Sequence, residues 1–300
     1  MDLKTFIDGE GTSIPLGLLA THQDLVNDIQ GQLMLLGLLD PPVDGKFGPV
    51  SKLALNILCR QANVSLNDGF STTVATALLD AADKDFFPLR PQADFAGRVV
   101  QAMRAQRFWI ARHPQYRNIV YIEGCNPDGT LNDNTPNRFN DVHLVISITA
   151  DGIPTIVDAW DGTTEPGKKW TMDPMDPKGA ARIAFGQYKA WTVGTHHAGS
   201  ASAHEALVQV AEVTVYRDLN QDFWREGDKT FTGIFGINQH WGYNLPHDDL
   251  GTSSAGCLVG RTKTGHRKFM SLVKQDPRYT VNNGYRFMST ILPVSALEEV

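Results

Sequence analysis

The sequence predicts an α+β protein with two domains, a small helical domain over residues 1–86 and a larger, mainly-β domain over residues 87–300. The length of 300 residues favours two domains over one small core. Leucines at helical spacing fill the first range, whereas short runs of β-branched and aromatic residues fill most of the second. The segment DKDFFPLRPQA, residues 83–93, holds two prolines and mixed charge and marks the boundary.

Three helices are expected in the first domain. Two apolar patterns with helical spacing lie within residues 24–62, namely Leu25, Ile29, Leu33 and Leu36, then Leu53, Leu55, Ile57 and Leu58. The turn-forming segment DPPVDGKFGP separates them. A third helix over 71–82 would begin at Ser71, whose hydroxyl is a favourable N-cap.

The second domain is expected to begin with a helix and to continue mainly as strands. Residues 94–112 have one broad apolar face, and His113-Pro114 is expected to end this helix. The predicted strands lie within residues 117–124, 141–149, 154–160, 205–218, 231–242 and 285–294. One further helix is expected over residues 265–275.

Composition and charge argue against two classes of partner. The net charge is −6 and no long lysine and arginine run occurs, so a nucleic-acid partner is not expected. No apolar run approaches the roughly 18 residues of a membrane span. The first residues lack the features of a secretory signal, so we expect synthesis in the cytoplasm without a signal peptide. Three widely spaced cysteines argue against a disulfide framework, and we expect a monomer.

A short motif between the first two predicted helices suggests a ligand. Asp44-Gly45 and Gly48-Pro49 are turn formers, and Phe47 could simply anchor the loop on a small core. The surrounding stretch also resembles the helical peptidoglycan-binding module of many cell-wall enzymes. The matching residues are Ile29-Gln30, Leu35-Leu36-Gly37, Val43-Asp44-Gly45, Phe47-Gly48-Pro49 and Lys52-Leu53-Ala54-Leu55. This resemblance implies peptidoglycan as the partner, with Asp44 and Phe47 as candidate binding residues.

His240 and Cys257, 17 positions apart, form the candidate catalytic pair. A free thiol has a pKa of about 8.5, and an imidazole within hydrogen-bond distance can take its proton. Gly256 permits unusual backbone geometry, Ser253 and Ser254 add hydroxyls, and nearby backbone N–H groups could form an oxyanion hole. Each residue alone is more often structural, the histidine at a strand end and the cysteine as a buried thiol.

The order and spacing of these residues resemble the L,D-transpeptidase (YkuD-like) family, in which a histidine precedes a Ser/Thr-His-Gly-Cys motif. The corresponding segments here are Ser254-Ala255-Gly256-Cys257 and His240-Trp241-Gly242, and Ala184 to Trp191 is similar to an upstream strand of that family. Two departures stand out. Ala255 replaces the motif histidine, and Leu258-Val259-Gly260-Arg261 replaces the usual Arg-Asn.

The resemblance implies that Cys257, activated by His240, forms an acyl-enzyme with an amide carbonyl of the peptidoglycan stem peptide. Hydrolysis and transpeptidation both stay open, as does the bond that is attacked. Gly256 and Ser254 complete the expected catalytic loop, and the substrate groove is expected to include Trp241, Gly242, Tyr243, Tyr188 and Ser253. A phage lysin released at lysis or a secreted effector fits a wall enzyme without a signal peptide.

Metal sites have weaker support. Asp218, Asn220, Asp222 and Asp228 alternate as in a calcium loop, but Lys229 stands where the bidentate glutamate should be, and an Asx-turn loop is the alternative. Zinc at His196, His197 and His204, or at His240 and His247 with Asp248, lacks a recognisable motif, and the first group suits an exposed loop. No cofactor is expected to be required. The competing functions are a non-catalytic peptidoglycan-binding protein and a zinc-dependent wall amidase.

Overall fold

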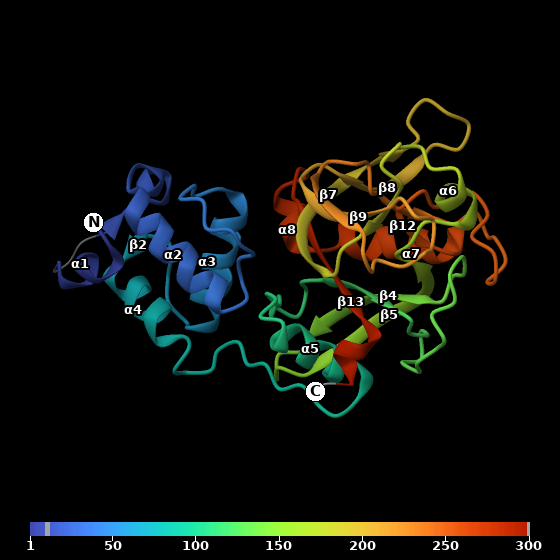
Figure 1. The fold of residues 1–300 in the computed structure, drawn as a ribbon. Coiled ribbons are helices and arrows are strands. Elements are labelled where there is room, and N and C mark those ends of the chain that lie inside the picture. Colours follow the sequence, from blue (N-terminus) through green and yellow to red (C-terminus); the bar gives the residue numbers. More distant parts are fainter. Residues whose placement is uncertain (10–12, 299–300) are drawn as a thin grey trace.

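Helices build the N-terminal part of the chain and strands build most of the rest (Figure 1). The computed structural model describes residues 1–9 and 13–298. The helical part contains α1 (Leu3–Asp8), α2 (Gln23–Leu35), α3 (Pro49–Gln61) and α4 (Thr72–Asp80), a 3-10 turn (Leu16–Thr21), and the paired short strands β1 (Ser13–Ile14) and β2 (Phe70–Ser71). The three predicted helices are confirmed, and the Ser71 hydroxyl caps α4 by accepting a hydrogen bond from the Val74 N–H at 3.3 Å.

The helix predicted over 94–112 is real but shorter than expected. It is α5 (Phe95–Ala105), and the Asp94 carboxylate caps it by accepting from the Gly97 N–H at 2.8 Å. Arg107 ends it with a left-handed φ of 57°, and the Phe108 N–H returns to the Met103 carbonyl at 2.9 Å. The prediction that His113-Pro114 ends this helix is therefore wrong, because a local C-terminal cap acts earlier in the chain.

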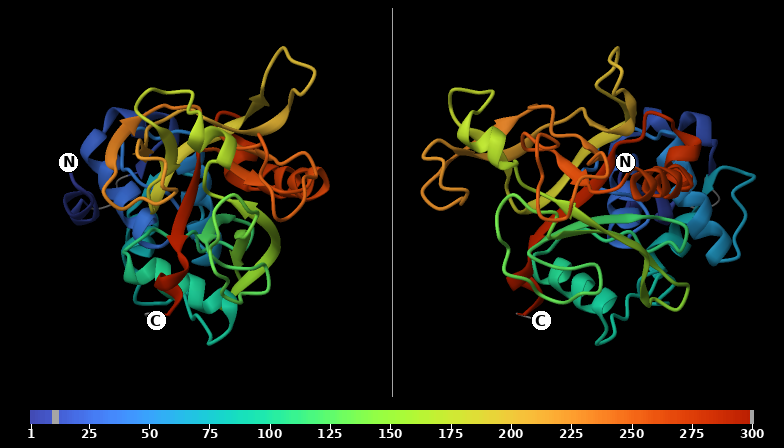
Figure 2. Two further views of the ribbon diagram at one scale, coloured as in Figure 1. Left: turned by 45° about the vertical axis from the view of Figure 1, so that its right-hand side comes forward. Right: turned by 90° about the vertical axis from the view of Figure 1, so that its right-hand side faces the viewer.

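Eight strands close into a barrel in the order β11-β12-β5-β4-β3-β13-β7-β8. They are β3 (Asn118–Glu123), β4 (Asp141–Ile148), β5 (Pro154–Thr163), β7 (Gly186–His196), β8 (His204–Gln209), β11 (Gln239–Trp241), β12 (Leu258–Gly260) and β13 (Phe287–Pro293). The pairs β11–β12 and β3–β13 are parallel and the other pairs are antiparallel. In Figure 2 the red β13 crosses the molecule and leads to the C-terminal turn (Val294–Leu297) beside α5. The α+β class is thus confirmed.

A second sheet and three helices complete the β-rich part. The sheet has the order β10-β9-β6, with β6 (Ala180–Ile183), β9 (Val213–Asp218) and β10 (Lys229–Gly233). The predicted run 205–218 therefore contains two strands, β8 and β9, which belong to different sheets. The helices are α6 (Lys168–Met172), α7 (Lys263–Lys274) and α8 (Pro277–Val281), of which α7 was predicted.

Side chains on opposite faces of β3 belong to two different apolar clusters of the β-rich part. Ile119 and Tyr121 join the cluster that includes Phe269 of α7, whereas Val120 and Ile122 join the cluster under α5. Both faces of this part of the sheet are therefore covered by a helix. Within the part of the chain that the structure describes, no helix is long and apolar enough to cross a membrane.

The helical part is held against the barrel by buried polar contacts. Asp40 is fully buried, accepts a hydrogen bond from the Tyr285 hydroxyl at 3.0 Å and forms an ion pair with Lys189 at 2.5 Å. The Trp109 indole N–H donates to the Met34 carbonyl at 2.9 Å. These contacts hold the helices, the blue segments of Figure 1, against the barrel.

Candidate functional site

A parallel strand pair places the predicted nucleophile and base on one face. Gln239 of β11 lies opposite Leu258 of β12, and the Leu258 N–H donates to the Asn238 carbonyl at 2.9 Å. Cys257 therefore lies beside Asn238. Because side chains alternate along extended chain, Cys257, Asn238 and His240 share a face. Among the described residues no hydrogen bond joins the thiol to His240, and their catalytic roles stay predictions.

The Cys257 thiol is held by backbone groups. Its Sγ accepts a hydrogen bond from the Asn238 N–H and donates one to the Gly236 carbonyl, each at 3.4 Å. Burial raises the pKa of the Cys257 thiol to about 11, although the Asn238 N–H acts in the opposite direction. The thiol is therefore neutral near pH 7, and a base must remove its proton during any attack.

The loop before Cys257 depends on a glycine and a serine. Gly256 has φ of 127°, and a Cβ added there would lie 2.4 Å from the Ala181 carbonyl oxygen. The Ser254 hydroxyl accepts from the Gly256 N–H at 3.1 Å and donates to the Cys257 carbonyl at 2.9 Å. The Ser253 hydroxyl donates to the Leu250 carbonyl at 2.8 Å. Both predicted serines thus hold the shape of the loop that presents the thiol.

The His240 imidazole is buried and held in one tautomer. It is 2% exposed, and its Nδ1 lies 2.9 Å from the Trp241 carbonyl oxygen. A carbonyl oxygen only accepts, so Nδ1 carries the proton and Nε2 has a free lone pair. Burial, followed by the charge of neighbouring His196, lowers the pKa of His240 well below its usual value. The resting pair is therefore a thiol and a neutral imidazole, without a pre-formed thiolate.

Two histidines expected in an exposed loop lie instead in this site. His196 ends β7, His204 begins β8, and they pair across the ladder at 5% and 7% exposure. His196 stacks on His240 with centroids 3.9 Å apart, and His204 stacks on Trp241 at 3.8 Å. The expectation of an exposed loop is wrong for both, because β7 and β8 extend further than the Gly/Ser-rich sequence suggests. Of the predicted loop histidines, His197 is exposed.

Two cavities flank the aromatic stack. One of about 390 Å³ contains Cys257 and is lined among others by Asn238, His196 and Trp170. The other, of about 570 Å³, is lined by Trp241, His204, His266 and Arg267 among others. Neither cavity is lined by Tyr188 among the described residues.

The other predicted groove residues do not all lie near His240. The Tyr243 ring lies 6.4 Å from that of His240, centroid to centroid. Gly242 is needed for packing, since an added Cβ would lie 2.7 Å from the Phe139 ring. Tyr188 lies eight positions before His196 on β7, and its hydroxyl donates to the Ala184 carbonyl at 3.1 Å. The structure therefore brings Trp241 and Tyr243 to the candidate site and leaves Tyr188 away from it.

The predicted binding residues of the helical part are engaged within their own loop. The Asp44 carboxylate accepts from the Gln30 amide and from the Lys46 N–H, each at 2.9 Å. Phe47 is half-buried and packs against the helical core. A groove of about 550 Å³ lies at the junction with the barrel and is lined by residues of both parts, including Asp44, Lys46 and Arg286.

The predicted calcium loop is built from Asx turns. The Asp218 carboxylate accepts from the N–H groups of Asp222 and Phe223 at 3.2 and 3.0 Å, and Asp222 accepts from the Trp224 N–H at 2.8 Å. The Asn220 amide donates to Asp222 at 2.8 Å. Burial, then the charges of Asp218 and Asp222, raises the pKa of Asp228 to about 6. Among the described residues no group of His, Cys, Asp or Glu side chains is arranged to hold a metal ion.

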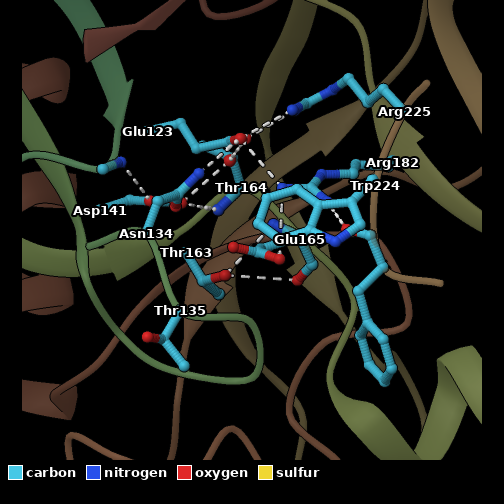
Figure 3. Close-up of polar contacts among 12 residues, drawn as sticks. Glu123, Asn134, Thr135, Asp141, Thr163, Thr164, Glu165, Arg182, Trp224 and Arg225 are labelled. Carbon is cyan, nitrogen blue, oxygen red and sulfur yellow. Dashed lines mark hydrogen bonds and ion pairs between the residues drawn. The ribbon is translucent and has the colours of Figure 1, made fainter. Parts of the chain in front are cut away.

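A buried ionic cluster that the sequence did not predict lies at the ends of β3, β4 and β5 (Figure 3). Glu123 accepts from Arg225 at 2.6 and 2.7 Å and from Arg182 at 2.9 Å. Asp141 accepts from the backbone and hydroxyl of Thr164. No sequence signal identified this cluster, because its members come from five separate segments.

The carboxyl groups of this cluster differ in the direction in which their pKa values are shifted. Burial would raise the pKa of Glu123, but Arg225 outweighs it and lowers the value to about 2. Burial and the charge of Glu123 raise the pKa of Asp141 to about 7, and burial raises that of Glu165 well above its usual value. Glu123, Asp141 and Glu165 are each less than 5% exposed. The carboxyl groups are therefore shielded from solvent, and their arginine partners join the barrel to β6 and to the 219–228 loop.

The fold and the geometry around Cys257 are the observations from which a function can be inferred. In comparisons with known proteins, no family model, no curated protein and no solved structure matches this chain.

Proposed function

We propose that the chain is a two-domain, L,D-transpeptidase-like cysteine enzyme acting on peptidoglycan, with the domain boundary near residue 86. The observation that carries this proposal is the β11–β12 register, which puts Cys257 and His240 on one face. The tautomer of His240 supports it, because its free Nε2 can accept a proton while Nδ1–H stays bonded to the Trp241 carbonyl.

The proposed reaction begins when the Cys257 sulfur attacks an amide carbonyl carbon of the stem peptide. The thiol proton passes to His240 Nε2 as the S–C bond forms, and the C=O electron pair moves onto oxygen. When the tetrahedral intermediate collapses, the C–N bond breaks and His240 protonates the leaving amine. Water or a second amine then attacks the thioester and gives its proton to His240, and the C–S bond breaks as that proton returns to the sulfur. Because the thiol pKa is raised and the imidazole pKa lowered, proton transfer accompanies attack.

The helical part supports peptidoglycan as the substrate through its Gln30–Asp44 loop, on which the module resemblance rests. Its fixed orientation against the barrel would present the wall to one side of the enzyme. We propose that the protein meets its substrate after release or delivery, as a lysin or a secreted effector does.

Mass spectrometry of muropeptides after incubation with sacculi tests the proposal. Wild-type protein should release or join stem peptides, and Cys257→Ala should lower that rate by about 10³-fold or more while still binding sacculi. Cys59→Ala is the matched control, since it removes a buried thiol of the helical core, and it should keep activity. Products that persist in Cys257→Ala and vanish with a chelator would support a zinc amidase instead.

A non-catalytic peptidoglycan-binding protein is the second candidate. The raised pKa of Cys257 and its hydrogen bond to the Gly236 carbonyl, rather than to an imidazole, favour it. Under this reading wild type and Cys257→Ala bind sacculi equally and leave every muropeptide mass unchanged.

A further inference from the structure

Asn238 fixes the proton on a second histidine of the site. Its Oδ1 accepts a hydrogen bond from the Gln209 N–H at 2.9 Å, so the amide nitrogen must point the other way. That nitrogen lies 3.0 Å from His196 Nδ1. Because an amide nitrogen only donates, His196 Nδ1 accepts and a neutral ring carries its proton on Nε2.

The Nε2–H of His196 is an unused donor. Burial, then the charges of His197 and His204, lowers the pKa of His196 to about 4, which keeps the ring neutral near pH 7. The ring is 5% exposed, and among the described residues its Nε2 has no hydrogen-bond partner. Buried polar groups without partners are rare and call for an explanation. His196 lines the same cavity as Cys257.

We propose that His196 is a catalytic residue whose Nε2–H donates a hydrogen bond to the carbonyl oxygen under attack by Cys257. This inference rests on the proposed acyl-enzyme chemistry and adds a donor to it. As the S–C bond forms, negative charge collects on that oxygen, and a pre-oriented donor in a water-poor site stabilises it. His240 receives the thiol proton and His196 keeps its own, so the two stacked rings have separate tasks.

Asn238 contacts both the Cys257 thiol and the His196 ring. Its backbone N–H holds the Cys257 sulfur and its side chain holds His196. His197, exposed and stacked on His196 at 3.8 Å, is the outer ring of the stack. It offers a matched position at which a ring can be changed without removing the donor.

Two reagents separate the donor role from thiol activation. p-Nitrophenyl acetate acylates a thiol through an oxyanion, whereas iodoacetamide alkylates it without one. His196→Phe should slow acylation by about 100-fold, the loss typical for one oxyanion donor, and leave alkylation unchanged. His196→Gln can accept from Asn238 and still donate, so it should retain most of the acylation rate. His197→Phe should match wild type with both reagents.

Other outcomes overturn the inference. Equal acylation by wild type and His196→Phe would make His196 a packing residue. A parallel loss of acylation and alkylation would mean that His196 acts on the thiol and its base. A ¹⁵N NMR spectrum of wild type tests the tautomer without activity, and a His196 proton on Nδ1 would also contradict the proposal.

Failure of the proposed function gives a different pattern. Acylation that depends on Cys257 and His196, together with unaltered sacculi, would support the donor and overturn the peptidoglycan substrate. Wild-type protein that p-nitrophenyl acetate does not acylate at Cys257 would overturn both.

Discussion

The helical part and the barrel bury their polar groups in different ways. In the helical part the Gln30 amide accepts from the N–H groups of Asp44 and Gly45 at 3.1 and 2.8 Å, within 15 positions along the chain. In the barrel Glu123 binds Arg225, 102 positions away, and Arg182, 59 positions away. A short-range motif can be recognised in sequence, whereas a long-range cluster exists only after the strands have assembled.

The two parts also differ in the groups that titrate. The helical part relies on an apolar core, the buried Gln30 amide and the buried Asp40 carboxylate at its contact with the barrel. The barrel buries histidines whose pKa values are lowered and carboxyl groups whose pKa values are raised. The response of the protein to charge removal and to acid should therefore come mainly from the barrel.

The largest effect is expected from Glu123→Gln. The change leaves Arg182 and Arg225 in the buried cluster without their shared carboxylate, and breaking a buried ion pair costs about 3–5 kcal/mol. Urea unfolding at pH 7 measures the loss of free energy of unfolding. The matched control Glu205→Gln removes a half-exposed partner of Lys274 and should cost less than about 1 kcal/mol. Equal losses in the two variants would contradict the contrast between buried and exposed charge.

Acid should destabilise the protein through its buried histidines. The pKa values of His196 and His266 are lowered from 6.5 to about 4, so only the unfolded chain takes up their protons between these values. The free energy of unfolding therefore falls as pH falls from 6.5 to 4, by up to about 1.4 kcal/mol per pH unit for each ring. Asp141, with its pKa raised to about 7, opposes this in part by favouring the folded state as pH falls below 7.

His266→Gln isolates one of these contributions. Glutamine can still donate to the Glu205 carbonyl, which His266 Nε2 contacts at 2.9 Å, but it does not titrate. The slope of unfolding free energy against pH should flatten by about 1 kcal/mol per unit near pH 5. Above pH 7 the variant and wild type should have the same slope. An unchanged slope near pH 5 would show that His266 is charged in the folded protein.

A smaller effect is expected from Gln30→Ala in the helical part. It leaves the Gly45 N–H without a buried acceptor and removes a donor to Asp44, which should cost about 1–3 kcal/mol. Gln32→Ala on the same helix is the control, because Gln32 is partly exposed, and it should stay within about 0.5 kcal/mol of wild type. Sacculus binding should fall for Gln30→Ala and not for Gln32→Ala if this loop binds the wall. Equal unfolding midpoints would contradict the structural role of the loop.

The sequence predicted the elements better than it predicted their partners. Helical spacing located α2, α3, α4 and α7, since each pattern depends on residues a few positions apart. It overran the end of α5, where Arg107 adopts a left-handed φ that no residue preference signals. It identified Cys257 and His240 as candidates but placed His196 in an exposed loop. The small polar residues near His196 in sequence suggest an exposed position, whereas the β7–β8 hairpin buries its side chain.

Sequence alone determined the class of the protein, the positions of most elements and the candidate pair of Cys257 and His240. These follow from periodicity, turn chemistry and short motifs, which act over a few residues. The tertiary structure decided that β11 and β12 run in parallel, that His196 and Asn238 line the cavity of the thiol, and that Glu123 and Glu165 share two arginines. The reason is physical: closing a barrel brings together groups separated by tens to hundreds of residues, and the resulting burial sets their pKa values and their free hydrogen-bonding groups.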